Sequence, residues 1–267
     1  MYISDARLDQ IILEDVPYCD LTTDFLDIAG EAGEIEFYTR EDAILCCVEE
    51  AIRIMEKLDL ELVDSIPSGT KVSAGSTFLR AQGKAGNLML AWKVVLNLFE
   101  HYCGVATKTH NFVQKVQAVN PYCQVLATRK TSPGNKEFLI KAIMTGGAVP
   151  HRLGLSETIL VFDWHRMFMG GFDEFLEKVP ELLAKSVEKR VLVEAEIDEA
   201  LQLVEVGVDA IQLDKVTPEN VKTYVEKLRS INPDVTILAA GGINEKNCEA
   251  YAASGANGLV TSALYKT

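Results

Sequence analysis

The second part of the sequence alternates short apolar runs with amphipathic helical segments, and this rhythm limits the possible folds more than any other feature. Successive strand–helix units with apolar strands are typical of a parallel sheet covered by helices. About six or seven strands fit, which favours an open, incomplete α/β barrel, with an open doubly wound sheet as the alternative. Strands are predicted at residues 125–128, 158–162, 191–195, 210–213, 235–239 and 258–261.

The first part of the chain lacks this regular alternation. Residues 33–39 alternate polar and apolar side chains, which suits a half-buried strand, and residues 77–82 form a second strand candidate. This α+β layout predicts one domain over residues 1–105 and a barrel domain over residues 106–267, with the extreme C-terminus packing on the N-terminal domain. Helical spacing is found at residues 1–13, 43–58, 85–103 and 107–119.

Composition and charge exclude several classes of protein. A chain of 267 residues that is 48% hydrophobic can bury a sizeable core and is not intrinsically disordered. Its net charge of -13 argues against a nucleic-acid-binding surface, which would be basic. No stretch approaches the roughly 20 apolar residues that cross a bilayer, and residues 1–15 lack the apolar segment of a signal peptide. We therefore expect a soluble cytoplasmic protein that binds neither nucleic acid nor membranes.

The cysteines give no sign of a metal centre. None of the six forms a C-x-x-C pair or has a histidine at zinc-finger spacing, and most lie in apolar runs. We expect them to be reduced and to act as small core residues.

Charged and polar residues gather where the predicted barrel strands end. In α/β barrels the working residues lie at the carboxyl ends of the strands. A random scatter of surface charges, the alternative reading, would not keep falling at one end of the strands. The residues concerned are Arg129 and Lys130, His151 and Arg152 in the loop before the second strand, Asp163 and His165, Glu194 and Glu196, Asp214 and Lys215, Ala240-Gly241-Gly242, and Thr261-Ser262.

These residue types suit a small polyanion bound together with a metal ion. Arg129, Lys130 and Arg152 can hold phosphate or carboxylate oxygens. Glu194 and Asp214 carry hard oxygen ligands for Mg²⁺, usually through water. We therefore expect a phosphate-handling site with both basic and acidic members.

A glycine turn adds a further anion-binding element. Gly241 and Gly242 open the next predicted helix and can present backbone N–H groups to a phosphate, with the hydroxyl of Ser262 beside them. Each weaker signal has a structural alternative: the glycines can form a tight connection only, Glu196 can face solvent, and His151 can be a structural hydrogen-bonding residue.

Several motifs in order resemble those of quinolinate phosphoribosyltransferase, also called nicotinate-nucleotide pyrophosphorylase. Together they are far more specific than any one alone. They are Glu14-Asp15 with Asp20-Leu21-Thr22-Thr23, Arg40-Glu41-Asp42, Gly104-Val105-Ala106-Thr107, Thr128-Arg129-Lys130-Thr131 with Pro133-Gly134, His151-Arg152-Leu153-Gly154-Leu155, Leu213-Asp214 and Gly241-Gly242-Ile243. The resemblance implies an N-terminal α/β sandwich with an open α/β barrel, in homodimers or dimer-based hexamers whose sites the partner subunit completes. The implied reaction joins a ring nitrogen of quinolinate to the ribose of phosphoribosyl pyrophosphate with Mg²⁺, and pyrophosphate leaves before decarboxylation.

The resemblance also implies a role for each matching residue. Lys130 matches a lysine at the reacting centre, and Glu194 with Asp214 matches the acidic pair beside the ribose and metal. The strand of Glu194 looks one residue shorter than the family pattern, so Glu196 is an alternative for the active carboxylate. Positions that bind the carboxylated acceptor are matched by Arg129, His151 and Arg152, and the phosphate cup is matched by Gly241, Gly242, Thr261 and Ser262.

Four positions depart from the family pattern. The lysine that would pair with a substrate carboxylate is Phe162 here, so a second carboxylate bound there would be left unpaired. The arginine offered across the dimer is Lys93, which cannot make the same bidentate contact. Pro150 replaces an asparagine before the His-Arg pair, and Ala240 replaces a serine before the two glycines.

These departures point to a sister branch of the family. Ala91-Trp92-Lys93 and residues 146–152 and 155–162 look like ModD, a pyrophosphorylase branch associated with molybdenum transport. We therefore predict a pentosyltransferase that moves phosphoribose from phosphoribosyl pyrophosphate to a heteroaromatic acid. Glu194 and Asp214 would stabilise positive charge on the sugar, and no protein nucleophile is needed. One alternative is quinolinate turnover for NAD biosynthesis, and a second is a non-catalytic phosphate- or oxyanion-binding protein linked to molybdate handling.

Overall fold

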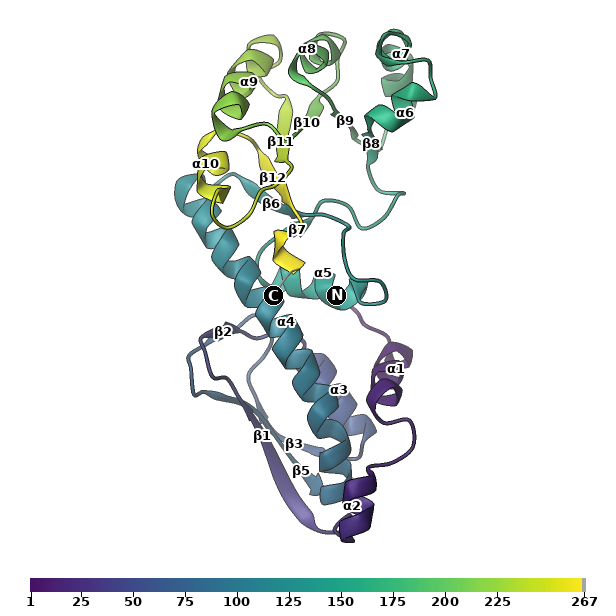
Figure 1. The fold of residues 1–267 in the computed structure, drawn as a ribbon, viewed down its shortest axis with the longest axis vertical. Coiled ribbons are helices and arrows are strands. Elements are labelled where there is room, and N and C mark those ends of the chain that lie inside the picture. The colour runs from purple at the N-terminus through teal and green to yellow at the C-terminus, as the bar shows by residue number, and fades with distance from the viewer. Residues whose placement is uncertain (266–267) are drawn as a thin grey trace. The chain divides into compact units, whose positions relative to one another are not determined.

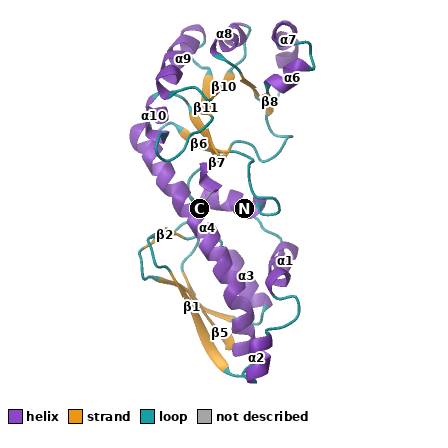
Figure 2. Ribbon diagram, viewed as in Figure 1, coloured by secondary structure: helices purple, strands orange, loops and turns teal. Residues whose placement is uncertain are grey.

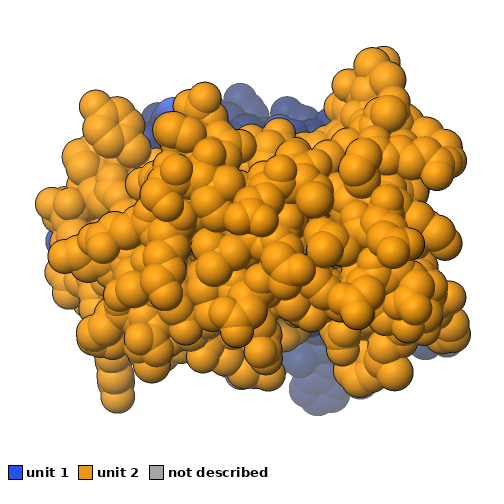
Figure 3. Space-filling model, turned by 90° about the horizontal axis from the view of Figure 1, so that it is seen from above, with its two compact units in different colours: residues 1–111, 132–147, 265–267 blue, residues 112–131, 148–264 orange. Residues whose placement is uncertain are grey.

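The computed structural model describes residues 1–265, which divide into two compact units, coloured separately in Figure 3. Among the described residues, unit 1 holds residues 1–111 and 132–147 and Tyr265, and unit 2 holds residues 112–131 and 148–264. The expected boundary near residue 105 falls inside helix α4 (Ala85–Val119). The expectation for the extreme C-terminus concerns residues that lie partly outside the described chain.

Unit 1 is built around an antiparallel sheet with the strand order β1-β5-β3 (Figure 1). The predicted strand at residues 33–39 is confirmed, because β1 covers Ala32–Tyr38 and pairs with β5 (Thr77–Lys84). The other strands are β3 (Glu61–Ser65) and the small pair β2 (Ala43–Ile44) and β4 (Lys71–Val72). The helices are α1 (Asp5–Asp15), α2 (Leu21–Leu26), α3 (Val48–Lys57), the first part of α4, and α5 (Lys136–Thr145).

Two helix predictions for this part of the chain were wrong. The segment 43–58 is not one helix, because Ile44 pairs with β4 and Cys47 has a left-handed φ of 62°, so the helix begins at Val48. The segments 85–103 and 107–119 form one helix, α4, which continues through Gly104. A single glycine costs a helix only about 1 kcal/mol, and the buried neighbours Val105 and Ala106 offset that loss by packing.

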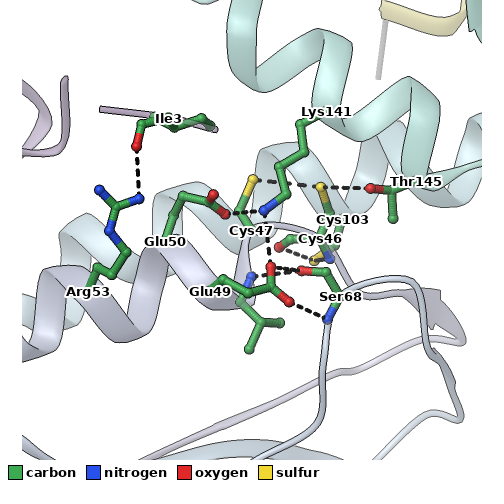
Figure 4. Close-up of polar contacts among 11 residues, drawn as sticks. Ile3, Cys46, Cys47, Glu49, Glu50, Arg53, Ser68, Cys103, Lys141 and Thr145 are labelled. Carbon is green, nitrogen blue, oxygen red and sulfur yellow. Dashed lines mark hydrogen bonds and ion pairs between the residues drawn. The ribbon is translucent and has the colours of Figure 1, made fainter. Parts of the chain in front are cut away.

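A buried ion pair joins two helices of unit 1. Lys141 on α5 forms ion pairs with Glu50 and, at 3.0 Å, with Glu49, both on α3 (Figure 4). The side chains of Lys141 and Glu50 are 13% and 4% exposed, whereas that of Glu49 is 49% exposed. Burial would raise the pKa of Glu49, but hydrogen bonds from Ser68 and Lys141 outweigh it and lower that pKa to about 2.

Unit 2 is a parallel α/β half-barrel, as predicted (Figure 2). Every predicted strand is present, and the short strand β7 makes a seventh. The strands are β6 (Gln124–Ala127), β7 (Val149–Pro150), β8 (Ile159–Val161), β9 (Val191–Glu194), β10 (Ala210–Asp214), β11 (Thr236–Ala240) and β12 (Gly258–Thr261). The helices are α6 (Asp163–Met167), α7 (Phe172–Lys185), α8 (Ile197–Glu205), α9 (Pro218–Ile231) and α10 (Cys248–Ala253), and the 3-10 turn Ala263–Tyr265 ends the described chain.

The strand order rules out the doubly wound alternative. The order β7-β6-β12-β11-β10-β9-β8 runs around a circle in chain order and has no point at which it reverses. The ring is open between β7 and β8, which are consecutive in the chain but are the two ends of the sheet. The barrel is therefore incomplete at one place, between two short strands.

Both faces of this sheet are apolar, which explains the continuous apolar runs in the sequence. The inner face carries one cluster of buried side chains, against which Phe162 packs. Helices α7 to α10 lie side by side in chain order on the outer face (Figure 1). The members of the inner cluster are Leu126, Leu160, Leu192, Ala210, Leu238, Ala240 and Val260.

The prediction for the cysteines is confirmed at five of the six positions. All six are free, and only Cys19 is exposed. Among residues 1–265, no helix is long and apolar enough to span a membrane.

Candidate functional site

Most of the predicted site residues lie at the carboxyl ends of the strands of unit 2. Glu194, Asp214, Ala240 and Thr261 are the last residues of β9, β10, β11 and β12. Parallel strands end at one edge of a sheet, so these positions share the same rim. Arg129 and Lys130 follow β6, Phe162 follows β8, Gly241 and Gly242 follow β11, and Ser262 follows β12.

His151 and Arg152 reach the rim through β7, which sequence reasoning missed. The backbone N–H of His151 donates to the carbonyl of Ala127 at 2.9 Å, so this residue continues the pairing of β7 with β6. A strand of two residues gives no periodic pattern, which explains why the segment read as a loop. The pair therefore stands beside the end of β6, next to the segment that carries Arg129.

The basic side of the rim is electrostatically crowded. Burial lowers the pKa of His151, and the guanidinium groups of Arg152 and Arg129 lower it further. Burial and Arg129 also lower the pKa of Arg152, although an arginine stays protonated. Lys130 is exposed, and its backbone N–H donates to the hydroxyl of Thr128 at 3.2 Å. This side of the rim is therefore suited to an anion, and His151 is neutral near pH 7.

Phe162 places an aromatic ring beside the basic side of the rim. The guanidinium carbon of Arg152 lies 5.9 Å from the ring centroid, in a cation–π arrangement. The imidazole of His165 stacks on the same ring at 5.8 Å, and its Nδ1 accepts the backbone N–H of Phe162 at 2.9 Å. The position thus offers a flat apolar surface and no positive charge of its own.

The acidic side of the rim consists of Glu194 and Asp214 on neighbouring strands. Burial raises the pKa of Glu194; a hydrogen bond from Gln212 opposes this rise, and the charge of Asp214 adds to it. Nζ of Lys215 lies 3.5 Å from Oδ2 of Asp214, but its side chain is 83% exposed. Two carboxylates that repel each other here are suited to stabilising a positive charge. Glu196, the alternative carboxylate, is the exposed N-cap residue of α8.

Gln212 was not predicted as a site residue. It lies on β10 directly opposite Glu194 of β9, and its Nε2 donates to Oε2 of Glu194 at 2.6 Å. The sequence did hold a signal, because Gln212 is a polar residue inside the apolar run Ala210–Asp214. A buried amide in a strand needs a polar partner, which makes such a residue a candidate for a site.

The glycine turn after β11 differs from the prediction in one respect. Gly241 and Gly242 have left-handed φ angles of 86° and 74°, but they do not open a helix, because α10 begins at Cys248. Side-chain amides of Asn244 and Asn247 donate to the carbonyl of Gly242 at 2.9 and 3.1 Å and hold an extended turn instead. Any anion binding here relies on backbone N–H groups of the turn.

Two further predicted site residues, Thr261 and Lys93, contact residues other than those of the basic and acidic sides of the rim. The hydroxyl of Thr261 donates to the carbonyl of Ile243 at 2.7 Å and accepts from the backbone N–H of Ala263 at 3.0 Å, so it braces the turn. Lys93 lies on α4 in unit 1, exposed, with its Nζ 5.8 Å from the ring of Trp92. Its role across a dimer stays a prediction.

Comparison with known proteins covers nearly the whole chain. Models of the quinolinate phosphoribosyl transferase N-terminal and C-terminal domains match residues 20–103 and 105–267. A Rhodobacter capsulatus protein that carries the name pyrophosphorylase ModD is 40% identical over 248 residues, which cover 92% of this chain and 94% of that protein. A Methanothermobacter thermautotrophicus protein with the name nicotinate-nucleotide pyrophosphorylase (carboxylating) is 30% identical over 263 residues, 96% of this chain and 94% of that protein. The structure of the nicotinate-nucleotide pyrophosphorylase from Francisella tularensis shares the fold, with a TM-score of 0.88 at 24% identity over 100% of this chain and 94% of the other.

Proposed function

The chain belongs to the quinolinate phosphoribosyl transferase family and is a pentosyltransferase, and we propose that it transfers phosphoribose from phosphoribosyl pyrophosphate to a heteroaromatic acid, as a ModD-type enzyme. One observation carries the proposal: the rim of the half-barrel separates a basic side from an acidic side. Arg129 and Arg152 stand at the ends of β6 and β7, whereas Glu194 and Asp214 end β9 and β10. Such a division suits a reaction between an anionic acceptor and a sugar that develops positive charge.

Each side of the rim then has a task. The guanidinium groups of Arg129 and Arg152 hold the acceptor carboxylate, and neutral His151 donates or accepts a hydrogen bond without adding charge. The carboxylates of Glu194 and Asp214 stabilise the positive charge that develops at C1 of the ribose when pyrophosphate leaves. The backbone of the turn at Gly241 faces the phosphate groups, and Lys130 neutralises charge at the reacting centre.

The acidic pair fits Mg²⁺ as a proposed cofactor. Among residues 1–265, no group of three or more His, Cys, Asp and Glu side chains could hold a metal by itself. Mg²⁺ does not need such a cage, because it commonly binds one or two carboxylates together with substrate phosphates and water. Burial and mutual repulsion disfavour the charge on Glu194, and a cation would relieve both. When bound, Mg²⁺ would neutralise the pyrophosphate leaving group.

Assembly belongs to the same proposal. We propose homodimers, or hexamers built from dimers, in which Lys93 of one subunit reaches the site of its partner. Size-exclusion chromatography with light scattering measures the subunit number. Mixing a Lys93→Ala variant with a Lys130→Ala variant tests the shared site. In a hybrid dimer one site would have both lysines and regain turnover, and the other site would lack both. No recovery on mixing would refute the shared site.

The central test is release of pyrophosphate. Purified protein is incubated with phosphoribosyl pyrophosphate, Mg²⁺ and a panel of heteroaromatic acids, and pyrophosphate is measured with a coupled assay. We expect release with at least one acid, and loss of at least about a hundredfold in Lys130→Ala. Lys222→Ala, a change on the exposed surface of α9, is the matched control. Turnover that survives Lys130→Ala would refute the role of that lysine, and molybdate binding without any pyrophosphate release would favour an oxyanion-binding role.

Quinolinate is a second candidate for the acceptor. The name of the Methanothermobacter relative and the cluster of Arg129, His151 and Arg152 favour a carboxylated pyridine. Phe162 argues against it, because a second carboxylate against this ring would have no cation at that position. Turnover of quinolinate by the wild-type protein would decide for this candidate. If Phe162→Lys creates or strengthens quinolinate binding, the ring is what excludes the second carboxylate.

A further inference from the structure

Gln212 is a buried amide on the inner face of the half-barrel. Side chains alternate along a strand, so Ala210, Gln212 and Asp214 of β10 share one face. Ala210 belongs to the inner cluster, which places Gln212 inside the barrel, one step below the rim. The residue is only 4% exposed. An amide in this position needs hydrogen-bond partners for both its nitrogen and its oxygen.

Only the nitrogen has such a partner. Nε2 donates to Oε2 of Glu194 at 2.6 Å, whereas Oε1 has no hydrogen bond to any residue between 1 and 265. An ionised carboxylate can only accept, so the amide must turn its N–H group to Glu194 and its oxygen away. The atom without a partner is therefore Oε1, which can only accept a hydrogen bond.

The neighbours of Gln212 on the inner face do not supply this donor. Leu238 of β11 is paired directly with Gln212, and Leu192 precedes Glu194 on the same face of β9. Both side chains are apolar. Toward the carboxyl ends of the strands, the next residue on this face is Asp214, a carboxylate. Because these neighbours offer no donor, the donor is either a water molecule or a group of a molecule bound at the rim, beside the acidic pair.

We propose that Gln212 is a specificity-determining residue whose Oε1 accepts a hydrogen bond from a ring hydroxyl of the bound ribose. The inference rests on the proposed function and deepens it, because it adds to the acidic pair a neutral acceptor that recognises the sugar. Ribose carries adjacent hydroxyl groups, and each can donate one hydrogen bond. Glu194 accepts from one of them and Gln212 from the other. The bond between Nε2 and Glu194 fixes the spacing of these two acceptors.

This arrangement predicts discrimination between ribose and its deoxy forms. A site built to accept a hydrogen bond rejects an analogue without the donor, because its buried acceptor is then left unsatisfied. We expect the wild-type protein to bind ribose 5-phosphate about tenfold more tightly than the 2-deoxy or 3-deoxy analogue that lacks the hydroxyl read by Gln212. Removing the amide should abolish that ratio, whereas the ratio for the other analogue, which depends on the carboxylate of Glu194, should fall much less because only its bond from Nε2 is lost.

The test is calorimetric binding of the three sugar phosphates to full-length protein in Mg²⁺ buffer. Gln212→Met keeps the length of the side chain without its polar atoms, and Gln212→Leu is a second apolar variant. Gln202→Met is the matched control, because Gln202 is an exposed glutamine on α8 of the same unit. Thermal unfolding of each variant shows that it is folded. A merely structural role of Gln212 would change all three affinities together, not one ratio.

Several results would overturn the inference. Equal binding of all three sugars by the wild-type protein would do so without any variant. So would unchanged ratios in Gln212→Met, as expected if water satisfies Oε1. If the variant changes only the binding of aromatic acids, Gln212 contacts the aromatic acid and not the ribose. If the wild-type protein binds neither ribose 5-phosphate nor phosphoribosyl pyrophosphate, the proposed function itself fails, and this outcome differs from all the others.

Discussion

Loss of the Lys141 ammonium should destabilise unit 1 strongly. In Lys141→Met the aliphatic part of the side chain stays, but the carboxylate of Glu50, which is 4% exposed, is left buried without its partner. Removing one member of a buried ion pair costs about 3–5 kcal/mol. Glu49 keeps its hydrogen bonds from Ser68 and is half exposed, so it should add little. We therefore expect the lower end of the range, about 3 kcal/mol, which lowers Tm by about 6–12 °C.

The assay is urea unfolding followed by the fluorescence of one tryptophan. The chain has two tryptophans, Trp92 in unit 1 and the exposed Trp164 in unit 2. A Trp164→Phe background therefore leaves a probe that reports on unit 1. Lys57→Met is the matched control in the same unit, because Nζ of Lys57 pairs with Asp9 at 2.8 Å nearer the surface, where the two side chains are 27% and 52% exposed. That change should cost less than about 0.5 kcal/mol.

A double-mutant cycle separates the pair from general packing. Adding Glu50→Gln to Lys141→Met removes the stranded charge and should recover at least half of the lost stability. Burial would lower the pKa of Lys141, but the hydrogen bonds that its ammonium donates to Glu50 and Glu49 outweigh it and raise that pKa. The stabilisation is thus full at neutral pH and is lost only as the pH rises through this raised value. A loss below about 1 kcal/mol in Lys141→Met, or no recovery in the double variant, would refute the reasoning.

Three further predictions concern unit 2. Gly241→Ala should cost about 3 kcal/mol in urea unfolding, because the new Cβ would lie 2.4 Å from the backbone nitrogen of Lys215 and the residue has a φ of 86°. Gly242→Ala should cost only about 1 kcal/mol, because no atom lies within 4 Å of the new Cβ. Glu194→Gln should abolish pyrophosphate release yet raise Tm at pH 7 by about 2 °C, because burial disfavours the charge of Glu194. This rise in Tm should shrink as the pH falls through the raised pKa of Glu194, and a lower Tm in the variant would contradict the assignment. Arg129→Gln should raise the pKa of His151 in an NMR titration, although burial keeps it below its ordinary value; an unchanged pKa would separate the two residues.

The sequence predicted the barrel well because its signal is local and repeated. Most strands of unit 2 are apolar on both faces, so a short run such as Val191–Glu194 stands out from the amphipathic helices around it. Unit 1 was harder. β3 (Glu61–Ser65) has no fully buried residue and therefore no apolar pattern. The left-handed residue Cys47 breaks a run whose spacing is otherwise helical, and it does so through backbone geometry that no local pattern reveals.

The candidate site shows the same division. Residues at the ends of predicted strands, such as Glu194 and Asp214, were found from strand ends and chemistry alone. The strand that carries His151 to the rim is too short to show periodicity, and the turn after Gly242 depends on two asparagine side chains that bond backward to one carbonyl. Gln212 stands out in the sequence as a polar residue inside an apolar run, but the partner of its nitrogen and the lack of one for its oxygen are visible only in the structure, because hydrogen bonding across strands cannot be read from a sequence.

The opening of the barrel between β7 and β8 has a consequence for how this enzyme can diversify. No backbone hydrogen bond joins these two strands, so at the rim the opening is spanned by side chains, with Arg152 after β7 resting on the ring of Phe162 after β8. Elsewhere around the ring, a substitution must respect the register of a paired neighbour. At this opening each strand has a paired neighbour on one side only, β6 for β7 and β9 for β8, so a change at residue 162 meets one paired strand instead of two. Under the proposed function, selection for a new acceptor can therefore act at residue 162 with little effect on the pairing of the strands.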